Sequence, residues 1–210
     1  MQSLTSLLSL FMFSSFYTYV FFLIALMSLF MLRCSTHATA AISSKKVIKR
    51  LAKLKPVFVE NVVFDDILDF TTISTKYRIT AKDSLASVYV PLTFINCTFK
   101  QGIKAFDGLD SNRVTTVFMQ QVSFINCTFE EVVNCRAASF KGGVNFSNST
   151  FKKMTSFEGA HFQGLPTYFS ETTFEAELRC QRAVFGGKLD FMKAVFNETV
   201  SFQNAQFNND

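Results

Sequence analysis

The feature that most constrains the fold of this chain is a register of phenylalanines in its C-terminal half. From Phe118 to Phe207, large apolar residues recur at steps that alternate between six and five, so the pattern repeats after every second step. Cys135 and Cys180 occupy two positions of this register, and one extra residue interrupts it between Gln163 and Tyr168. The seventeen positions, which we expect to form the structural core, are Phe118, Phe124, Phe129, Cys135, Phe140, Phe146, Phe151, Phe157, Phe162, Phe169, Phe174, Cys180, Phe185, Phe191, Phe196, Phe202 and Phe207.

A second set of small or branched residues precedes these positions by two residues. Neither a helix nor one straight strand keeps both sets on one face, because a step of five turns a helix by about 140° and reverses the face of a strand. A chain that bends once per position does so, and its coils would stack about 4.8 Å apart. The pattern therefore predicts a solenoid. The second set holds Cys127, Ala138, Ser149, Ala160, Thr172, Ala183, Ala194 and Ala205 in one series, and Val122, Val133, Val144, Thr155, Thr167, Leu178, Leu189 and Val200 in the other.

Segments such as Val144–Phe151 and Lys193–Asn197 resemble the pentapeptide-repeat family, whose motif places a small residue at i−2 and Leu or Phe at i. The match is to the Phe-rich variety, in which two successive repeats make one period of eleven residues. The resemblance implies an all-β fold, a right-handed quadrilateral β-helix with about four faces per coil. Seventeen positions would then make a little over four coils. The family's frequent Asn or Asp at i−1 is mostly Thr, Ser, Val, His or Gln here.

The repeat extends upstream, because Leu92–Phe99 nearly duplicates Val122–Phe129. We therefore expect the β-helix to cover residues 92–210. The separation of Phe99 from Phe118 exceeds one period by eight positions, which predicts a protruding loop at residues 100–112 that is rich in turn-forming Gly, Asp, Ser and Asn. Residues 57–91 are expected to form an irregular cap or first coil around Phe58, Phe64 and Phe70, with Val62 and Leu68 two residues before the last two.

The N-terminal segment, residues 1–33, predicts a transmembrane anchor. Leu7–Leu32 is a run of 26 residues without a charge, which is long enough as a helix to span the roughly 30 Å hydrocarbon core of a bilayer. The alternative is a cleaved signal peptide with Ala38–Ala40 as a small-residue cleavage site, which would make the protein secreted. A charged n-region is missing and the apolar run exceeds a usual h-region, so we favour a single-pass anchor.

Residues 34–56 form a basic juxtamembrane linker. Basic residues from Arg33 to Lys55 precede the first acid, Glu60, and positive charge beside a span is retained in the cytoplasm, which favours a cytoplasmic repeat domain. Two interpretations of the linker stay open: an amphipathic helix lying on anionic lipid, and a solvated basic segment that ends at Pro56. The helical interpretation depends on the spacing of Val47, Ile48, Leu51 and Leu54.

Charge and reactive side chains do not indicate an enzyme or a nucleic-acid binder. Residues 92–210 hold eleven Lys and Arg and eleven Asp and Glu, so the β-helix lacks the excess of positive charge that nucleic acid would select. The Cys residues show neither a CxxC motif nor a spacing with His; Cys97 and Cys127 fall on i−2 core positions, and His161 stands alone. We therefore expect no catalytic residue, cofactor or metal. The one acidic cluster, interpreted as a solvated cap, is Asp65, Asp66 and Asp69.

The favoured function is a membrane-anchored, non-catalytic module that presents a rigid β-helix to a protein partner. The resemblance also implies an alternative, a DNA-mimicking topoisomerase inhibitor, which would need acidic stripes; a β-helix carbohydrate-active enzyme is the second alternative. Only three polar residues follow Phe207 in this sequence, so we expect a homodimer through the exposed end of the last coil, at Phe202 and Phe207. N-glycosylation sequons, relevant only in an exported protein, occur at Asn96, Asn126, Asn145, Asn148 and Asn197.

Overall fold

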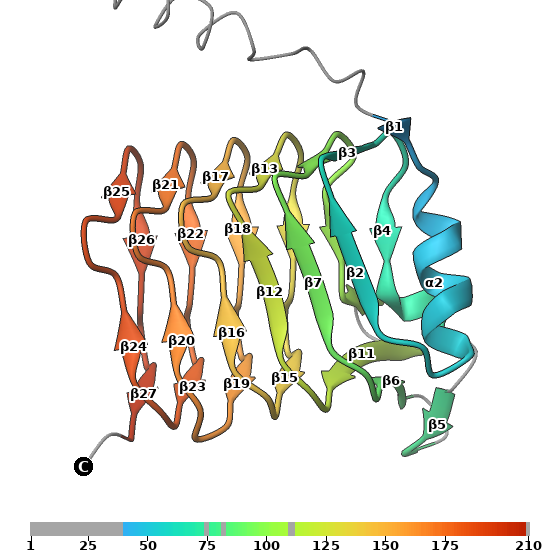
Figure 1. Cartoon of the computed structure of the whole chain (residues 1–210). Helices are drawn as coiled ribbons and strands as arrows, with labels where there is room; N and C mark the ends of the chain where they lie inside the picture. The colour runs from blue at the N-terminus through green and yellow to red at the C-terminus, as the bar shows by residue number, and fades with distance from the viewer. Residues whose placement is uncertain (1–39, 74–75, 81–82, 109–111, 209–210) are drawn as a thin grey trace, which may run out of the picture. The chain divides into compact units, whose positions relative to one another are not determined.

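In the computed structural model, short strands stack into four parallel sheets that form the four faces of a β-helix (Figure 1). The structure describes residues 40–73, 76–80, 83–108 and 112–208. The predicted transmembrane anchor or signal peptide, residues 1–33, lies outside these residues. Among the described residues, no helix has the length and apolar character that crossing a bilayer requires.

The chain visits the four faces in the same order in each of six coils within the described residues. Face 1 holds β2 (Val57–Glu60), β7 (Leu92–Ile95), β12 (Val122–Ile125), β16 (Val144–Asn145), β20 (Thr167–Tyr168) and β24 (Leu189–Asp190). Face 2 holds β3 (Val62–Phe64), β8 (Thr98–Phe99), β13 (Thr128–Phe129), β17 (Thr150–Phe151), β21 (Thr173–Phe174) and β25 (Val195–Phe196), and β1 (Ala40–Ala41) pairs with β3.

Faces 3 and 4 complete each coil. Face 3 holds β4 (Leu68–Asp69), β9 (Ile103–Lys104), β14 (Val133–Asn134), β18 (Thr155–Ser156), β22 (Leu178–Arg179) and β26 (Val200–Ser201). Face 4 holds β6 (Asp83–Val88), β11 (Arg113–Phe118), β15 (Ser139–Phe140), β19 (His161–Phe162), β23 (Val184–Phe185) and β27 (Gln206–Phe207), with β5 (Lys76–Arg78) antiparallel to β6 and β10 (Phe106–Asp107) antiparallel to β11.

The strand register reproduces the sequence period. Phe129 pairs with Phe151, its counterpart two periods later, so one coil consists of two periods of the sequence pattern. Val144 pairs with Thr167, one position further along than two periods, because the extra residue is absorbed in the corner between β19 and β20. Gly164 in that corner has a φ of 69°, and Leu165 points outward with 49% of its surface exposed. The insertion thus changes one corner and leaves the core positions in register.

Phenylalanine rings fill the interior in columns, one ring per coil. Rings stack nearly parallel from Phe94 to Phe191 under face 1, with centroids 4.9–5.4 Å apart, and from Phe64 to Phe196 under face 2, with centroids 4.5–5.3 Å apart. A third column runs from Phe118 under face 4 at 4.8–5.4 Å. Such spacings suit offset aromatic stacking.

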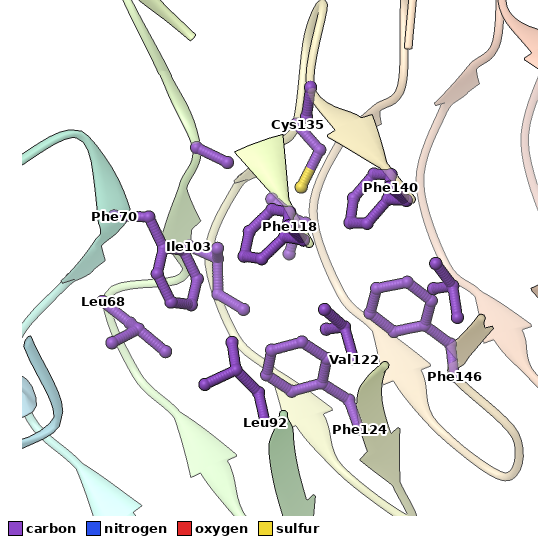
Figure 2. Close-up of a cluster of buried hydrophobic side chains, with 14 of the residues drawn as sticks. Leu68, Phe70, Leu92, Ile103, Phe118, Val122, Phe124, Cys135, Phe140 and Phe146 are labelled. Carbon is purple, nitrogen blue, oxygen red and sulfur yellow. The ribbon is translucent and has the colours of Figure 1, made fainter. Parts of the chain in front are cut away.

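Face 3 lacks a continuous column, because its core positions hold both phenylalanines and small residues. Phe157 lies between Cys135 one coil earlier and Cys180 one coil later, and all three are buried. Figure 2 shows Cys135 beside the rings of Phe118 and Phe140 in this part of the core. The small thiols leave room for the Phe157 ring in a closely packed interior. The face 3 positions are, in order, Phe70, Ala105, Cys135, Phe157, Cys180 and Phe202.

The predicted core positions are buried from Phe118 to Phe185, but the last coil differs. Phe191 and Phe202 are only partly buried, while Phe196 and Phe207 are 38% and 53% exposed. The prediction that these last two are core residues is wrong. All four sheets end at the sixth coil in the described part of the chain, so no further ring covers them.

Residues 57–91 form the first coil, which keeps the strand register of the repeat but is irregular between β4 and β6, where a 3₁₀ helix (Phe70–Thr72) and the β5–β6 hairpin lie. Its strands β2, β3, β4 and β6 pair in register with β7, β8, β9 and β11 of the next coil. Phe64 and Phe70 are buried as predicted, but Phe58 is 64% exposed and Val59 takes the inward position. The prediction counted Phe58 as an inward residue, whereas its neighbour Val59 is the inward one, so the predicted register was one residue out at this point.

The expected loop at residues 100–112 begins later than predicted. Ile103–Lys104 is a regular strand of face 3, and Ala105 occupies its core position, fully buried. The insertion is an antiparallel hairpin of β10 and β11, and the first coil carries a similar hairpin of β5 and β6. The two long strands β6 and β11 run parallel over six residue pairs, and Arg113 donates to both carboxylate oxygens of Asp83 at 2.9 and 3.0 Å.

Candidate functional site

A helix, α2 (Ser44–Ala52), covers the start of the first coil beside β2 and β4 (Figure 1). Its first turn is held by Asp66, whose carboxylate accepts hydrogen bonds from the Ser44 amide and the Ser43 hydroxyl, both at 2.7 Å. The Ser44 hydroxyl donates to the Ile67 carbonyl at 2.7 Å. These bonds supply the N-terminal amides of the helix with acceptors and fasten it to the coil.

The apolar side of α2 closes the core. Val47 and Leu51 are 4% and 3% exposed and belong to the same buried cluster as the phenylalanines, and Ile48 packs against it. The helical interpretation of this segment therefore holds, but the apolar side faces protein in this structure. Of the two interpretations left open for this linker, the burial of Val47 and Leu51 contradicts the one in which these residues lie on lipid, because they cover the core of the first coil instead. Leu54, which the helical spacing also included, follows the helix and is exposed.

The opposite side of α2 is basic. At about 100° per residue, Lys45, Lys46 and Lys49 lie on the side opposite Val47 and Leu51, Arg50 lies at the edge of that side, and Lys53 is the C-cap residue that follows the helix. All of these cations are exposed, and Arg50 Nε donates to the Pro56 carbonyl. None of the salt bridges among the described residues involves this helix. The cations of this surface, which we call the basic cap face, are Lys45, Lys46, Lys49, Arg50 and Lys53.

Each member of the acidic cluster has a structural partner. Asp65 forms a salt bridge with Lys100 at 2.7 Å, and Asp66 holds α2. Asp69 accepts from the amide and the hydroxyl of Thr71, at 2.9 and 2.6 Å, and so caps the short 3₁₀ helix η1 (Phe70–Thr72). No group of His, Cys, Asp and Glu side chains in the described residues has the arrangement of a metal site.

The four described cysteines are free thiols inside the β-helix. Burial raises the pKa of Cys135 and of Cys180 to about 12. A hydrogen bond with Cys97 and burial also raise the pKa of Cys127. The hydrogen bond with Cys127 instead lowers the pKa of the buried Cys97 thiol to about 7. The other three thiols, whose pKa values are raised, are poor nucleophiles, and all four positions fit the packing interpretation.

A hydrogen-bond ladder follows the i−2 positions at the corner between faces 1 and 2. The Ser149 hydroxyl donates to the Phe124 carbonyl of the preceding coil at 2.9 Å and accepts from the Cys127 amide at 3.0 Å. The Thr172 hydroxyl donates to the Phe146 carbonyl at 2.9 Å in the same way. These polar groups are buried, so the ladder satisfies backbone atoms that the turn leaves unpaired.

The same corner explains three of the five sequons. Asn96, Asn126 and Asn148 have φ values of 52–59°, a left-handed conformation that Asn tolerates better than most residues. The Asn126 side chain donates to Asn96 Oδ1 at 2.7 Å, and Asn96 donates to Asn61 Oδ1 at 3.1 Å. Turn geometry therefore accounts for Asn at these positions, which are exposed on successive coils.

The end of the sixth coil exposes apolar surface. Phe196 and Phe207 point inward but lack a covering ring, and Met192 and Val195 beside them are 59% and 48% exposed. Phe202, the other predicted residue of this end, is partly buried between the rings of Phe185, Phe191 and Phe207. Sequence reasoning missed Met192 and Val195, although both fall outside the inward register and so were candidates for exposure.

The flanks of the β-helix carry paired charges on successive coils. Lys152 lies 3.4 Å from Glu130, and Lys193 lies 3.4 Å from Glu171. Glu158 pairs with Arg136, 3.7 Å away, and with Arg182. His161 is exposed on β19. Opposite charges alternate along these rows, so the rows present little net charge.

Comparison with known proteins gives one match. A family model for pentapeptide repeats, in nine copies, matches residues 115–160 and 136–184, which is about one third of the chain. No curated protein and no solved structure matches this chain. The matched residues lie within the coils whose Phe columns and two-period register are described above. Residues 115–184 of this chain are therefore pentapeptide repeats.

Proposed function

We propose that this protein is a membrane-anchored, non-catalytic binding module that presents its β-helix to a protein partner. The observation that carries the proposal is a scaffold stacked on itself for six coils that still exposes apolar rings at its last coil. Three columns of stacked Phe make a stiff support, because each ring is held by the rings of the coils before and after it. A stiff apolar surface binds a partner with little loss of conformational entropy.

Membrane attachment is supported by the sequence. The uncharged run Leu7–Leu32 has the length of a membrane span, and the basic residues that follow it favour a cytoplasmic repeat domain. The anchor would hold the β-helix near the bilayer and so raise its effective concentration toward partners at the same surface.

The charge rows disfavour the alternative of DNA mimicry. A mimic of the phosphate backbone needs unpaired acidic side chains at regular spacing. Here Glu130, Glu158 and Glu171 each lie beside a cation of a neighbouring coil. The acidic cluster likewise gives a carbohydrate-cleaving mechanism no support, since Asp65, Asp66 and Asp69 are held by Lys100, by α2 and by Thr71.

Fractionation of cells that express the full chain tests the proposal. We expect the protein to stay in the membrane pellet after washing with alkaline carbonate, and mass spectrometry to find an N-terminal peptide from residues 1–33. A matched chain that lacks residues 1–33 should be released. A mature protein that begins near Ala41 would identify a signal peptide and refute the anchor. Protease digestion of intact cells and of vesicles then assigns the side on which the β-helix lies.

A further inference from the structure

The two sides of α2 differ in what covers them. The apolar side is filled by the first coil, with Val47 and Leu51 buried. Figure 1 shows α2 at the end of the stack of coils, beside β2 and β4. Because Val47 and Leu51 on its inner side are buried, the exposed cations of the basic cap face lie on the side away from the first coil. Five exposed cations between residues 45 and 53, with no acidic residue in that stretch, make this the densest run of positive charge along the described chain. Asp66 and Asp69 border it on one side, where they line a shallow depression together with Lys45 and Lys49.

We propose that the basic cap face binds the anionic headgroups of the membrane that the chain is anchored in, and that the β-helix therefore stands end-on to the bilayer. The inference rests on the proposed membrane anchor. Binding would be electrostatic and would not require insertion, because the apolar residues of α2 are occupied by protein. This differs from an amphipathic helix, which buries its apolar side in the lipid.

Chain length makes this contact possible. Leu32, the last residue of the apolar run, precedes Ser44 by 12 residues, which at full extension span about 40 Å at most. The helix is thus tethered within about that distance of any bilayer that the run crosses. A tether of this length keeps the basic cap face at high effective concentration toward the headgroups. The six coils would then place the exposed rings of Phe196 and Phe207 about 24 Å beyond the first coil, facing away from the membrane.

Lipid fits this surface better than nucleic acid does. Sequence-specific readers place a helix or a β-ribbon deep in the major groove, whereas four of the cations here lie on a helix of nine residues, and Lys53 on the residue after it, and the other side of this helix is packed against the first coil. The flanks that continue from it carry paired charges and would not extend a positive track for a nucleic-acid backbone. A flat anionic surface needs no such track.

Lysine footprinting on the full chain in vesicles tests the inference. The protein is reconstituted in phosphatidylcholine vesicles with and without phosphatidylserine and treated briefly with a membrane-impermeant acetylating ester. Mass spectrometry then gives the acetylation rate of each lysine. We expect the rates at Lys45, Lys49 and Lys53 to fall by about threefold or more in the anionic vesicles and to recover at about 0.5 M salt. Lys141 and Lys153, exposed on the described coils and outside their salt bridges, are internal controls whose rates should not change.

Charge reversal provides matched variants. Lys49→Glu combined with Lys53→Glu should abolish the protection of Lys45, while Lys141→Glu combined with Lys153→Glu should preserve it. All four positions are exposed, so both variants should keep the fold, which circular dichroism checks. Equal acetylation of Lys45 in neutral and anionic vesicles would overturn the inference. Protection by a DNA duplex with none by anionic lipid would overturn it in favour of nucleic acid.

Flotation of the vesicles at low salt and neutral pH, without a carbonate wash, separates this inference from the proposed function. A chain that floats with both kinds of vesicle but shows no lysine protection keeps its anchor and loses the lipid contact. A chain that floats only with anionic vesicles, and shows the protection, has the lipid contact without the anchor. A chain that floats with neither refutes both.

Discussion

At the scale of single residues, the size of a core side chain is set by its neighbours one coil away. Phe157 fits because Cys135 and Cys180 lie before and after it on face 3. For the same reason, residues at equivalent positions of the register contribute different amounts to the free energy of unfolding. A ring with neighbours on both sides loses more contacts on truncation than a ring at the end of a column.

We predict that Phe146→Ala lowers the free energy of unfolding by about 3–5 kcal/mol, whereas Phe196→Ala lowers it by about 1–2 kcal/mol. Phe146 is 1% exposed and stacks on Phe124 and Phe169, while Phe196 is 38% exposed and stacks on Phe174 alone within its column. Thermal and denaturant melts of the full chain in a mild detergent measure both values. Lys152→Ala, on the surface, is the control and should stay within about 0.5 kcal/mol. Equal losses for the two rings would mean that the last coil is covered.

The hydroxyl ladder gives a second prediction at this scale. Ser149→Ala should cost about 1–3 kcal/mol, because it leaves the Phe124 carbonyl and the Cys127 amide without the buried partner they share. Ser147→Ala, one turn position away and only partly buried, is the control and should cost less than half as much. The melts described above measure the difference. A Ser149→Thr variant should restore stability, since Thr172 fills the equivalent position.

At the scale of elements, corners differ in the side chains that they accept. Gly142, between β15 and β16, has no room for a side chain, because an added Cβ would lie 2.3 Å from the backbone of Gln120. Gly159, between β18 and β19, has a φ of 63° but open space around it, and Ala137 occupies the equivalent turn position one coil earlier with a φ of 52°.

Gly142→Ala should therefore cost about 2 kcal/mol or more, and Gly159→Ala about 1 kcal/mol or less. Each variant adds one methyl group, so the pair separates backbone collision from the cost of a left-handed conformation. Denaturant midpoints of the two variants decide it. If Gly159→Ala proved the more harmful change, strain in the turn and not contact between coils would limit these corners.

The cap helix depends on a carboxylate, and this gives a pH dependence. Burial tends to raise the pKa of Asp66, but hydrogen bonds from the Ser44 amide and the Ser43 hydroxyl outweigh it, so the pKa lies below its ordinary value. A carboxyl whose pKa is depressed by folding stabilises the native state above its unfolded pKa of about 3.9, and that contribution is lost as the pH falls through the lower native pKa.

We therefore expect Asp66→Asn to weaken α2 near neutral pH, and the difference from the wild type to shrink as the pH falls below about 3.9 and through the lower native pKa. Hydrogen exchange of the amides of α2, measured by mass spectrometry on both proteins across this range, is the test. Asp65→Asn is the matched control, because the salt bridge of Asp65 is to the exposed Lys100 and not to the helix. An Asp66→Asn effect that is independent of pH would assign the role of Asp66 to its shape and not to its charge.

At the scale of the whole molecule, the uncovered last coil predicts self-association. We expect an end-to-end homodimer in which the sixth coils of two chains cover each other across a two-fold axis. The buried surface would centre on Phe196 and Phe207, with Phe202 partly covered already. Unpaired edges and exposed rings at the end of a solenoid favour such a contact.

Sedimentation of the chain from residue 40 onward, the compact unit of the structure, measures the dimer. Phe196→Glu combined with Phe207→Glu should give a monomer, while Val132→Glu, which adds a charge at an exposed apolar residue of the flank, should leave the dimer intact. Circular dichroism shows whether each variant remains folded. A wild-type chain that stays monomeric at high concentration would refute the dimer and leave the apolar end to a different partner.

The sequence alone specified the repeating part of the fold. Each coil buries the same kinds of residue at the same spacing. The period from Phe118 to Phe185 therefore predicts how often the chain bends, which residues point inward and how the strands pair. Local rules suffice there, because every position contacts only its own coil and the next. The extra residue before Tyr168 lies in a corner, so Val144 still pairs with Thr167 and Phe146 still stacks on Phe169.

Only the tertiary structure decided what happens where the repetition stops. Val47 and Leu51 are buried because the first coil has an open end that they cover, and the periodicity of the helix alone does not predict that end. The exposure of the five cations on the other side has the same cause. The exposure of Phe196 and Phe207 depends on the absence of a following coil in the described chain, although their sequence context matches that of Phe174 and Phe185. Whether a residue is buried depends on the coils on either side of it, and at each end of the stack one of these coils is missing or is replaced by another element.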